Sequence, residues 1–216
     1  KVLEERKKWS RIRLAFDKYE GWIDNKQFVF ISEEDYKSIK ASEQELATDL
    51  VDFVSTEKDQ LISIPIGACV SSATLLQHTF EGKSISVKLP KEQIINTALL
   101  YLNAPYLWGG KTPFGIDCSG FTQMVYRLNG YALLRDASQQ ASQGEALSFI
   151  EESEPGDLAF FDNAEGAITH VGIIMEDNYI IHAHGRVRID RLDHTGIFNY
   201  DKRAHTHKLR VIKRII

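Results

Sequence analysis

Cys118 has the sequence surroundings best suited to a chemical role. It follows a glycine-rich stretch, 108–115, and opens a run of apolar residues at helical spacing. A thiol at a helix N-terminus lies near unpaired N–H groups and the positive end of the helix dipole, and both favour the nucleophilic thiolate. The alternative, a small buried apolar residue, stays open on position alone. Cys69, between Ala68 and Val70, is expected to be such a buried residue.

A thiolate nucleophile needs a base, and three histidines could supply one from a shared sheet face. His170 begins one expected strand, and His182 and His184 lie on the next. All three numbers are even, so an odd-length turn places them on one face, with His170 opposite His184 and His182 one diagonal step away. A two-residue turn would separate His170 from His182. The spacing permits a Cys–His–His arrangement, and structural histidines with satisfied hydrogen bonds remain the alternative.

Metal binding is the competing use of these residue types. His182 and His184 could supply two zinc ligands, but the sequence has no CxxC or HxxxH spacing, and no second cysteine lies near them. The glycines at 109–110 lead into neither a phosphate loop nor a dinucleotide-binding motif. We therefore expect no metal and no cofactor, and nothing in the sequence supports a disulfide between the two cysteines.

Composition limits the partners of the chain. Its 216 residues include 26 Lys and Arg and 30 Asp and Glu, which gives a formal charge of −4. These values are ordinary for a globular protein that buries a core. The mild acidity argues against a nucleic-acid or membrane partner, and no apolar run approaches the roughly 18–20 residues that span a bilayer. The oligomeric state is not indicated.

The first 90 residues are expected to form small β-rich segments. Ser32 is a helix N-cap candidate, because acidic residues follow it at 33–35. Pro65 marks an edge strand or a bulge, and residues 81–83 are typical of a hairpin turn. The expected strands are 12–16, 22–23, 28–31, 61–66, 75–80 and 84–89.

From Pro90 onward the pattern changes to helices followed by strands. Helical spacing covers 91–103, where Pro105 stops it, and 118–128, where Asn129 and Gly130 end it. Helices followed by a run of strands favour an α+β fold. The expected strands are 156–161, 170–175, 179–184 and 209–216.

Several motifs together carry a family resemblance. They are YLWGG at 106–110, DCSGF at 117–121, GDL at 156–158, HVGI at 170–173 and IHA at 181–183. From about residue 91 to the end, the chain resembles the NlpC/P60 family of papain-like cysteine peptidases. Residues 9–23 resemble a bacterial SH3-like domain. The layout is similar to the γ-D-glutamyl-L-diamino acid dipeptidyl-peptidase branch, in which two SH3-like modules precede the catalytic domain.

The resemblance implies a domain layout. Residues 1–48 would be an SH3-like domain, incomplete at its N-terminal side, with a linker. Residues 49–90 would be a second SH3-like module, and residues 91–216 the papain-like catalytic domain.

The resemblance also implies roles for individual residues. Cys118 would be the nucleophile, His170 the base and then the acid, and His182 the residue that orients His170. Tyr106 would lie near the developing oxyanion, with the Cys118 N–H as a second donor. His184 becomes a neighbour of the site. The residues implied to bind the substrate are Trp108, Asp117, Ser119, Arg135, Asp136 and Ser138.

The expected substrate follows from the same branch. It is a murein stem peptide with a free N-terminal L-Ala, cleaved between γ-D-Glu and meso-diaminopimelate or Lys. Asp117 and Asp136 offer carboxylates to the terminal ammonium. Tyr19 and Glu20 are candidates for a wall beyond L-Ala, with turn and core packing as the alternative.

Two other function classes are alternatives to this activity. One is a papain-like amidase or acyltransferase that acts on another amide, and the other is a non-catalytic protein that binds cell-wall peptide. The complete set of Cys118, His170 and His182 argues against a binding protein. Recycling of released peptides and an essential reduced thiol favour a cytoplasmic location.

Overall fold

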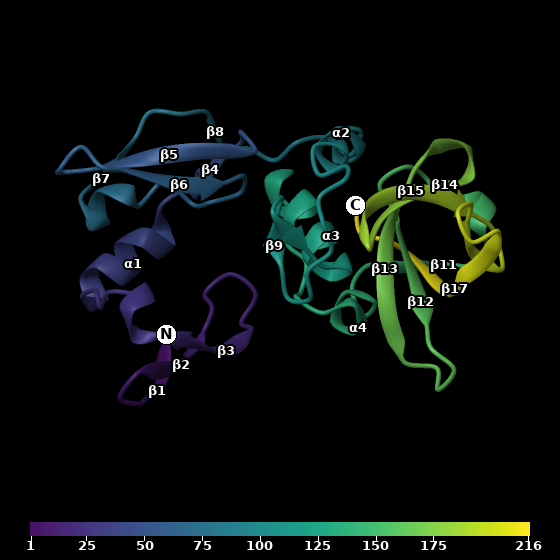
Figure 1. The fold of residues 1–216 in the computed structure, drawn as a ribbon, viewed down its shortest axis with the longest axis horizontal. Helices are drawn as coiled ribbons and strands as arrows, with labels where there is room; N and C mark the ends of the chain where they lie inside the picture. The colour runs from purple at the N-terminus through teal and green to yellow at the C-terminus, as the bar shows by residue number, and fades with distance from the viewer.

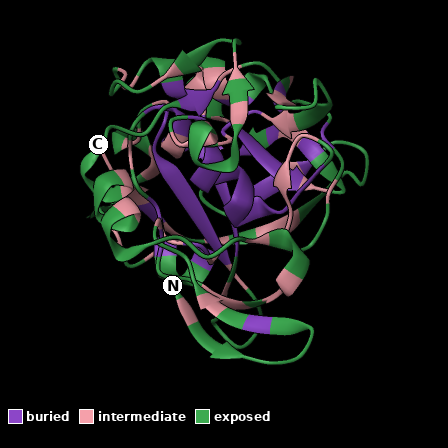
Figure 2. Ribbon diagram, turned by 90° about the vertical axis from the view of Figure 1, so that its left-hand side faces the viewer, coloured by how far each residue is buried: buried purple, intermediate pink, exposed green.

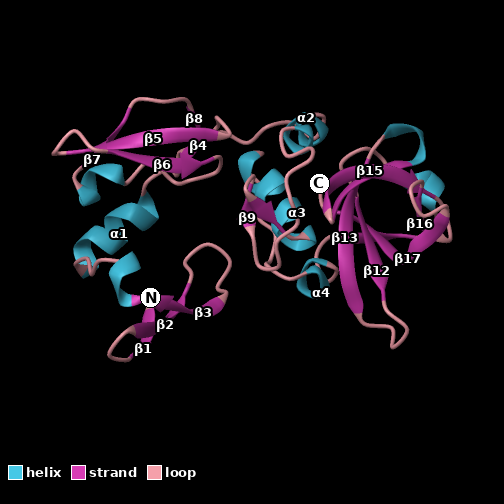
Figure 3. Cartoon of the chain, viewed as in Figure 1, coloured by secondary structure: helices cyan, strands magenta, loops and turns pink.

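The computed structural model describes residues 1–216 and arranges them as two small β-rich lobes, a layer of helices and a strand barrel (Figure 1; Figure 3). In the first lobe, three strands form an antiparallel sheet in the order β1-β2-β3. The predicted cap is confirmed, because the Ser32 side chain accepts a hydrogen bond from the Asp35 N–H. The elements are β1 (Val2–Glu5), β2 (Trp9–Arg13), β3 (Glu20–Asp24), the 3₁₀ turn η1 (Asn25–Gln27) and α1 (Glu33–Ala41).

The strand expected at 28–31 is wrong. These residues have no strand partner, and Phe30 is 70% exposed. An apolar run forms a strand only where a neighbouring strand meets its backbone hydrogen-bonding groups, and none lies beside this run.

The second lobe holds one three-stranded sheet, β6-β5-β7, and one two-stranded pair, β4-β8. Pro65 lies in edge strand β6, as predicted. The hairpin expected at 81–83 is wrong, because β7 pairs with β5 and β8 with β4. The elements are β4 (Leu46–Ala47), β5 (Val51–Thr56), β6 (Leu61–Pro65), the 3₁₀ turn η2 (Ala73–Leu76), β7 (His78–Phe80) and β8 (Ser84–Ile85). The SH3-like nature of both lobes stays a prediction.

The helical layer follows, and its long helix is the one predicted to begin at Cys118. The helix α3 lies against strands β13 and β14 of the barrel. Its Phe121 and Val125 share one buried cluster with Ile173 and Ile181 of those strands. The elements are α2 (Gln93–Leu99), β9 (Lys111–Thr112), β10 (Gly115–Ile116), α3 (Cys118–Leu128) and α4 (Ala137–Gln140).

The barrel is antiparallel throughout, in the order β11-β17-β12-β13-β14-β15-β16. Strand β17 also pairs with β16, which closes strands β12 to β17 into a ring. The mixed helix and strand content confirms the α+β prediction. The elements are β11 (Glu145–Leu147), the 3₁₀ turn η3 (Ile150–Glu152), β12 (Leu158–Asp162), β13 (Ile168–Ile174), the 3₁₀ turn η4 (Glu176–Asn178), β14 (Tyr179–His184), β15 (Arg186–Leu192), β16 (Gly196–Asn199) and β17 (Ala204–Arg214).

Burial is concentrated in α3 and the barrel strands, whereas the two N-terminal lobes are mostly exposed or half-buried (Figure 2). The first lobe therefore depends on contacts with the helical layer for its position. The Phe16 ring lies 4.5 Å from the Arg127 guanidinium. The buried Asp17 carboxylate accepts a hydrogen bond from Gln123 Nε2 at 3.0 Å.

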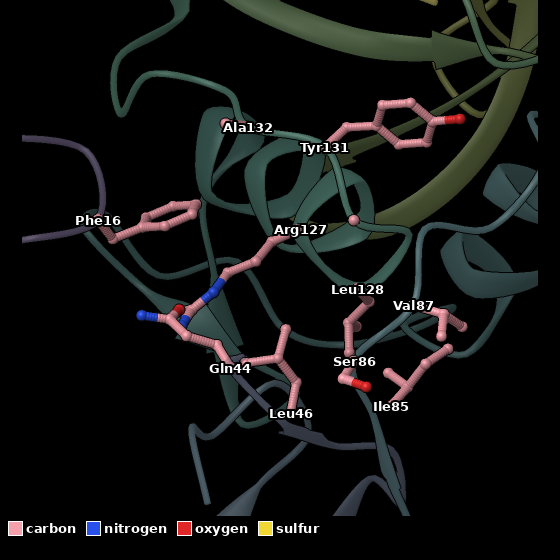
Figure 4. Close-up of a pocket in the computed structure, with 11 residues that line it drawn as sticks. Phe16, Gln44, Leu46, Ile85, Ser86, Val87, Arg127, Leu128, Tyr131 and Ala132 are labelled. Atoms are coloured by element: carbon pink, nitrogen blue, oxygen red, sulfur yellow. The ribbon is translucent and has the colours of Figure 1, made fainter. Parts of the chain in front are cut away.

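A cavity of about 230 Å³ remains where both lobes meet the C-terminal end of α3 (Figure 4). Phe16, Leu46 and Val87 contribute apolar side chains to it, and Arg127 points into it from α3. No Cys, His, Asp or Glu lines this cavity, and its ionisable side chains are those of Arg127 and Tyr131. None of the helices is long and apolar enough to cross a membrane.

Candidate active site

The buried carboxylate of Asp117 fixes the position of Cys118. Asp117 is the N-cap of α3, and its Oδ1 accepts the Gly120 N–H at 2.6 Å. Arg135 donates to both carboxylate oxygens, at 3.0 and 2.7 Å, and the Gly109 N–H donates to Oδ2 at 2.8 Å. One carboxylate thus joins the glycine-rich loop, the helix start and the segment at 135.

This geometry assigns Asp117 a structural role. Although Asp117 lines the cleft beside Cys118, its two oxygens already accept hydrogen bonds from Gly109, Gly120 and Arg135. A substrate ammonium would have to displace one of them. The carboxylate left for that task is Asp136, which makes no salt bridge within the chain and lines the same cleft.

The predicted histidine pair forms on the sheet face that the parity argument allowed. Strands β13 and β14 pair Gly172 with His182 and Ile174 with Ile180, so the connecting turn has odd length. His170 Nε2 lies 2.8 Å from His182 Nδ1. Gly172 permits this close approach, because a Cβ there would lie 2.9 Å from the Cβ of His182.

A fourth residue extends the pair. His182 Nε2 lies 3.1 Å from Asp190 Oδ2 on β15, and Arg188 donates to Asp190 Oδ1 at 2.9 Å. Asp190 and His182 are both almost fully buried. Burial alone would raise the pKa of Asp190, but the hydrogen bonds from His182 and Arg188 lower it, so the group is a carboxylate.

The carboxylate sets the proton positions of both rings. A carboxylate only accepts hydrogen bonds, so His182 Nε2 carries the hydrogen and its Nδ1 accepts. His170 must then donate from Nε2. Burial lowers the pKa of His170 well below its usual value, and the neighbouring histidines lower it further, so the ring is neutral. Its Nδ1 is therefore the free base.

Cys118 differs from the expectation of a ready-made thiolate. Burial raises the pKa of its thiol to about 11, the Asp117 carboxylate adds to this, and nearby backbone N–H groups act in the opposite direction. The effect of the helix terminus is therefore outweighed. The thiol lies 3.9 Å from the Thr169 carbonyl oxygen and shares a pocket with His170. A nucleophilic role for this sulfur would require a base that takes the thiol proton.

Tyr106 lies in that pocket with Cys118 and His170. Its backbone N–H donates to the Gly185 carbonyl at 3.0 Å, which ties it to the turn after β14. Its hydroxyl makes no hydrogen bond within the chain. Burial raises the pKa of Tyr106, and Cys118 adds to this, so the phenol stays protonated as a donor for an oxyanion.

The other predicted substrate-binding residues line a cleft of about 530 Å³ that ends at Cys118. Tyr19 reaches it from the first lobe, whereas Glu20 pairs with Arg11 and Arg13 on that lobe's sheet. The predicted residues in this lining are Trp108, Asp117, Ser119, Arg135, Asp136 and Ser138.

Sequence reasoning missed Asp190 and Arg188, because strand β15 was not expected. The sequence held a signal for this strand, because Gly185 can form a tight turn after the strand that carries His182. In the structure Gly185 has a φ of +71° and is the single residue between β14 and β15, so even-numbered residues lie on the same face of both strands. The burial expected for Cys69 is wrong, since this residue is exposed. Both cysteines are free thiols. No group of three or more His, Cys, Asp or Glu is arranged to hold a metal ion.

The closed barrel, the buried helix with Cys118 at its start and the series His170–His182–Asp190 together define a candidate thiol site. Residues 103–206 match the model of the NlpC/P60 family, and this stretch includes Tyr106, Cys118, His170 and His182. The chain therefore contains an NlpC/P60 family domain, as the sequence resemblance predicted.

Curated relatives match over part of their length. The chain is 42% identical over 94 residues to a protein from Bacillus subtilis named gamma-D-glutamyl-L-lysine dipeptidyl-peptidase, which covers 43% of this chain and 31% of that protein. It is 35% identical over 122 residues to dipeptidyl-peptidase 6 of Lysinibacillus sphaericus, covering 55% and 41%. The chain thus spans less than half of these relatives.

A solved structure resembles the chain over its full length. It is an NlpC/P60 family protein from Bacillus cereus with a TM-score of 0.75 at 23% identity, covering 100% of this chain and 78% of that one. At this identity the similarity shows a common fold, including the lobes that precede the barrel.

Removal of Asp190 is expected to slow alkylation of Cys118 by iodoacetamide at pH 7. In Asp190→Ala, His182 loses the partner that fixes its tautomer, so His170 Nδ1 is a free base in fewer molecules. We expect a loss on the order of tenfold, which is less than the roughly 10²–10⁴-fold worth of a whole general base because His170 itself is retained. The measurement is peptide mass spectrometry in a Cys69→Ser background, because Cys69 is exposed.

Asp201→Asn is the matched control, since Asp201 also pairs with Arg188 but is largely exposed and does not touch His182. An unchanged rate in Asp190→Ala would show that His182 needs no carboxylate partner.

Acid is expected to destabilise the protein from about pH 6.5 downward. Burial lowers the pKa values of His170, His182 and His184, and that of His207 to about 3, while histidines of the unfolded chain titrate near 6.5. Below that pH the unfolded chain binds more protons than the folded protein. The free energy of unfolding therefore decreases as the pH is lowered. The melting temperature should decrease as the pH is lowered from 7.5 to 5.5, and this decrease should be less steep in His207→Phe than in wild type. Equal slopes would contradict this assignment.

Proposed function

We propose that the protein is a cysteine peptidase that hydrolyses the γ-D-glutamyl–diamino acid bond of peptidoglycan stem peptides with a free N-terminal L-Ala. The observation that carries the proposal is the buried chain from His170 through His182 to Asp190, which leaves one basic nitrogen in a pocket shared with Cys118. A protein that only bound peptide would not need this arrangement. The names of the relatives from two Bacillus species support the bond.

The residues divide the reaction into acylation and hydrolysis. His170 Nδ1 takes the thiol proton as Cys118 Sγ attacks the γ-glutamyl carbonyl carbon. The oxyanion receives hydrogen bonds from the Tyr106 hydroxyl and the Cys118 N–H. His170 returns its proton to the leaving amine as the C–N bond breaks, which leaves a thioester. His170 then deprotonates a water that hydrolyses this thioester and regenerates the thiol.

The cleft on the Tyr19 side of Cys118 suits a short acyl part. Tyr19 comes from the first lobe, and the loop that carries it is held by the bond from Gln123 to buried Asp17. We take Tyr19 as the wall that limits the acyl part to the two residues before the scissile bond. Asp136 is the carboxylate available to the terminal ammonium there. The lobes, which we take as SH3-like, would thus set where cleavage occurs.

The bond and the nucleophile can be tested together by mass-spectrometric product analysis. Wild type should release L-Ala-γ-D-Glu from L-Ala-γ-D-Glu-L-Lys and from the meso-diaminopimelate peptide. Cys118→Ala should release none, because no other group can form the thioester, while Cys69→Ser should retain activity. Turnover by purified Cys118→Ala would overturn the mechanism, and no cleavage by wild type would overturn the proposed bond.

Recognition of the free amine is expected to depend on Asp136. Asp136→Asn removes the charge but keeps the shape, and should raise KM for the free-amine peptide by roughly tenfold, as for one charge-assisted hydrogen bond. Asp49→Asn, on the exposed second lobe, is the control. Steady-state kinetics with free and N-acetylated peptides measure the effect. Equal use of both peptides by wild type would refute ammonium recognition.

A further inference from the structure

A second pocket opens on the other side of Cys118 from Tyr19. It has a volume of about 370 Å³, and it shares Thr169 and Cys118 with the first cleft. His170 lies in this second pocket. In the proposed function His170 protonates the departing amine, so the leaving amino acid occupies this pocket. The inference below rests on that function.

Two histidines of this pocket take no part in the hydrogen-bonded series that runs from His170 through His182 to Asp190. His207, on β17, stacks on the His170 ring with centroids 4.2 Å apart and an interplanar angle of 26°. His184, on β14, lies 4.8 Å from the His207 ring and nearly perpendicular to it. His207 Nδ1 lies 2.9 Å from Thr206 Oγ1, whereas His184 makes no hydrogen bond within the chain. Three ring nitrogens are therefore open to a ligand.

The charge of this pocket favours an anion over a cation. Burial lowers the pKa of His184, and that of His207 to about 3, so both rings are neutral near pH 7 and each offers an N–H donor. No carboxylate lines the pocket. The nearby carboxylate of Asp190 is buried and already bonded, whereas Lys202 adds positive charge near both rings. Donors beside a cation suit a carboxylate and disfavour an ammonium.

We propose that His184 and His207 form a carboxylate subsite for the leaving amino acid. The α-carboxylate of that residue is attached to the carbon that carries the scissile nitrogen, so it enters the pocket when the amine faces His170. Diaminopimelate brings a second carboxylate with the same chemistry. The enzyme thus prefers peptides in which the residue after γ-D-Glu ends the chain.

The test compares leaving groups on one acyl part. The substrates are L-Ala-γ-D-Glu-L-Lys, its C-terminal carboxamide, and the meso-diaminopimelate peptide amidated at the carboxyl next to the scissile nitrogen. Wild type should cleave the free acid with a kcat/KM about tenfold above the Lys carboxamide, the worth of one charge-assisted hydrogen bond. If wild type cleaves the amidated diaminopimelate peptide as fast as L-Ala-γ-D-Glu-L-Lys, the subsite binds the side-chain carboxylate of diaminopimelate. If wild type cleaves it as slowly as the Lys carboxamide, the subsite binds the α-carboxylate.

The variants are His184→Ala and His207→Phe, which keeps a ring against His170 but removes both nitrogens. Each should lower kcat/KM for the free acid more than for the carboxamide, so that the ratio approaches one. His205→Ala, on the same strand but outside this pocket, should keep the wild-type ratio.

The outcomes separate this inference from the proposed function. A wild-type ratio near one, or variants that slow acid and amide equally, would overturn the carboxylate subsite while leaving the peptidase intact. Absence of cleavage of every peptide by wild type would overturn the peptidase, and the subsite with it.

Discussion

The buried salt bridge between Arg135 and Asp117 holds together the segments that surround Cys118. Both side chains are buried, and the carboxylate also accepts N–H groups from the glycine-rich loop and the helix start. Buried carboxylates persist only when paired and fully hydrogen-bonded, so the glycine-rich loop, the helix start and the segment at 135 must stay together around Asp117. The same charge disfavours a thiolate at the adjacent Cys118. The interaction that places the nucleophile therefore makes a base necessary.

The barrel supplies that base in a defined tautomer. Three successive antiparallel strands place His170, His182 and Asp190 side by side, and closure through β16 and β17 adds His207 against the His170 ring. Each neighbour has a separate effect. Asp190 determines which nitrogens carry hydrogen, and burial keeps the rings neutral. The two rings are therefore neutral, and the only charge in the series from His170 to Asp190 is the carboxylate that His182 and Arg188 bind.

The pockets on either side of Cys118 differ in where their walls come from. The first is lined mainly by the helical layer and by Tyr19, a residue nearly a hundred positions from Cys118 in sequence, whereas the second is lined mainly by barrel strands together with Tyr106 and Cys118. The wall that Tyr19 contributes to the first cleft depends on the docking of the first lobe, which has little buried core. Asp17 and Phe16 hold this lobe through their contacts with Gln123 and Arg127 of α3. The shape of the first cleft thus depends on the docking of the first lobe, whereas the second pocket involves no residue of either lobe.

The sequence by itself determined the local chemistry of this protein. Helical spacing over 118–128 placed Cys118 at a helix start, and the even numbering of His170 and His182 allowed a shared sheet face, because helix period and strand alternation are properties of the local chain. Only the tertiary structure decided that Asp117 forms a salt bridge with Arg135 and that Asp190 binds His182. It also decided that burial keeps the Cys118 thiol protonated and that Tyr19 lines the cleft. Each of these depends on burial or on contacts between segments far apart in sequence, which local periodicity does not record.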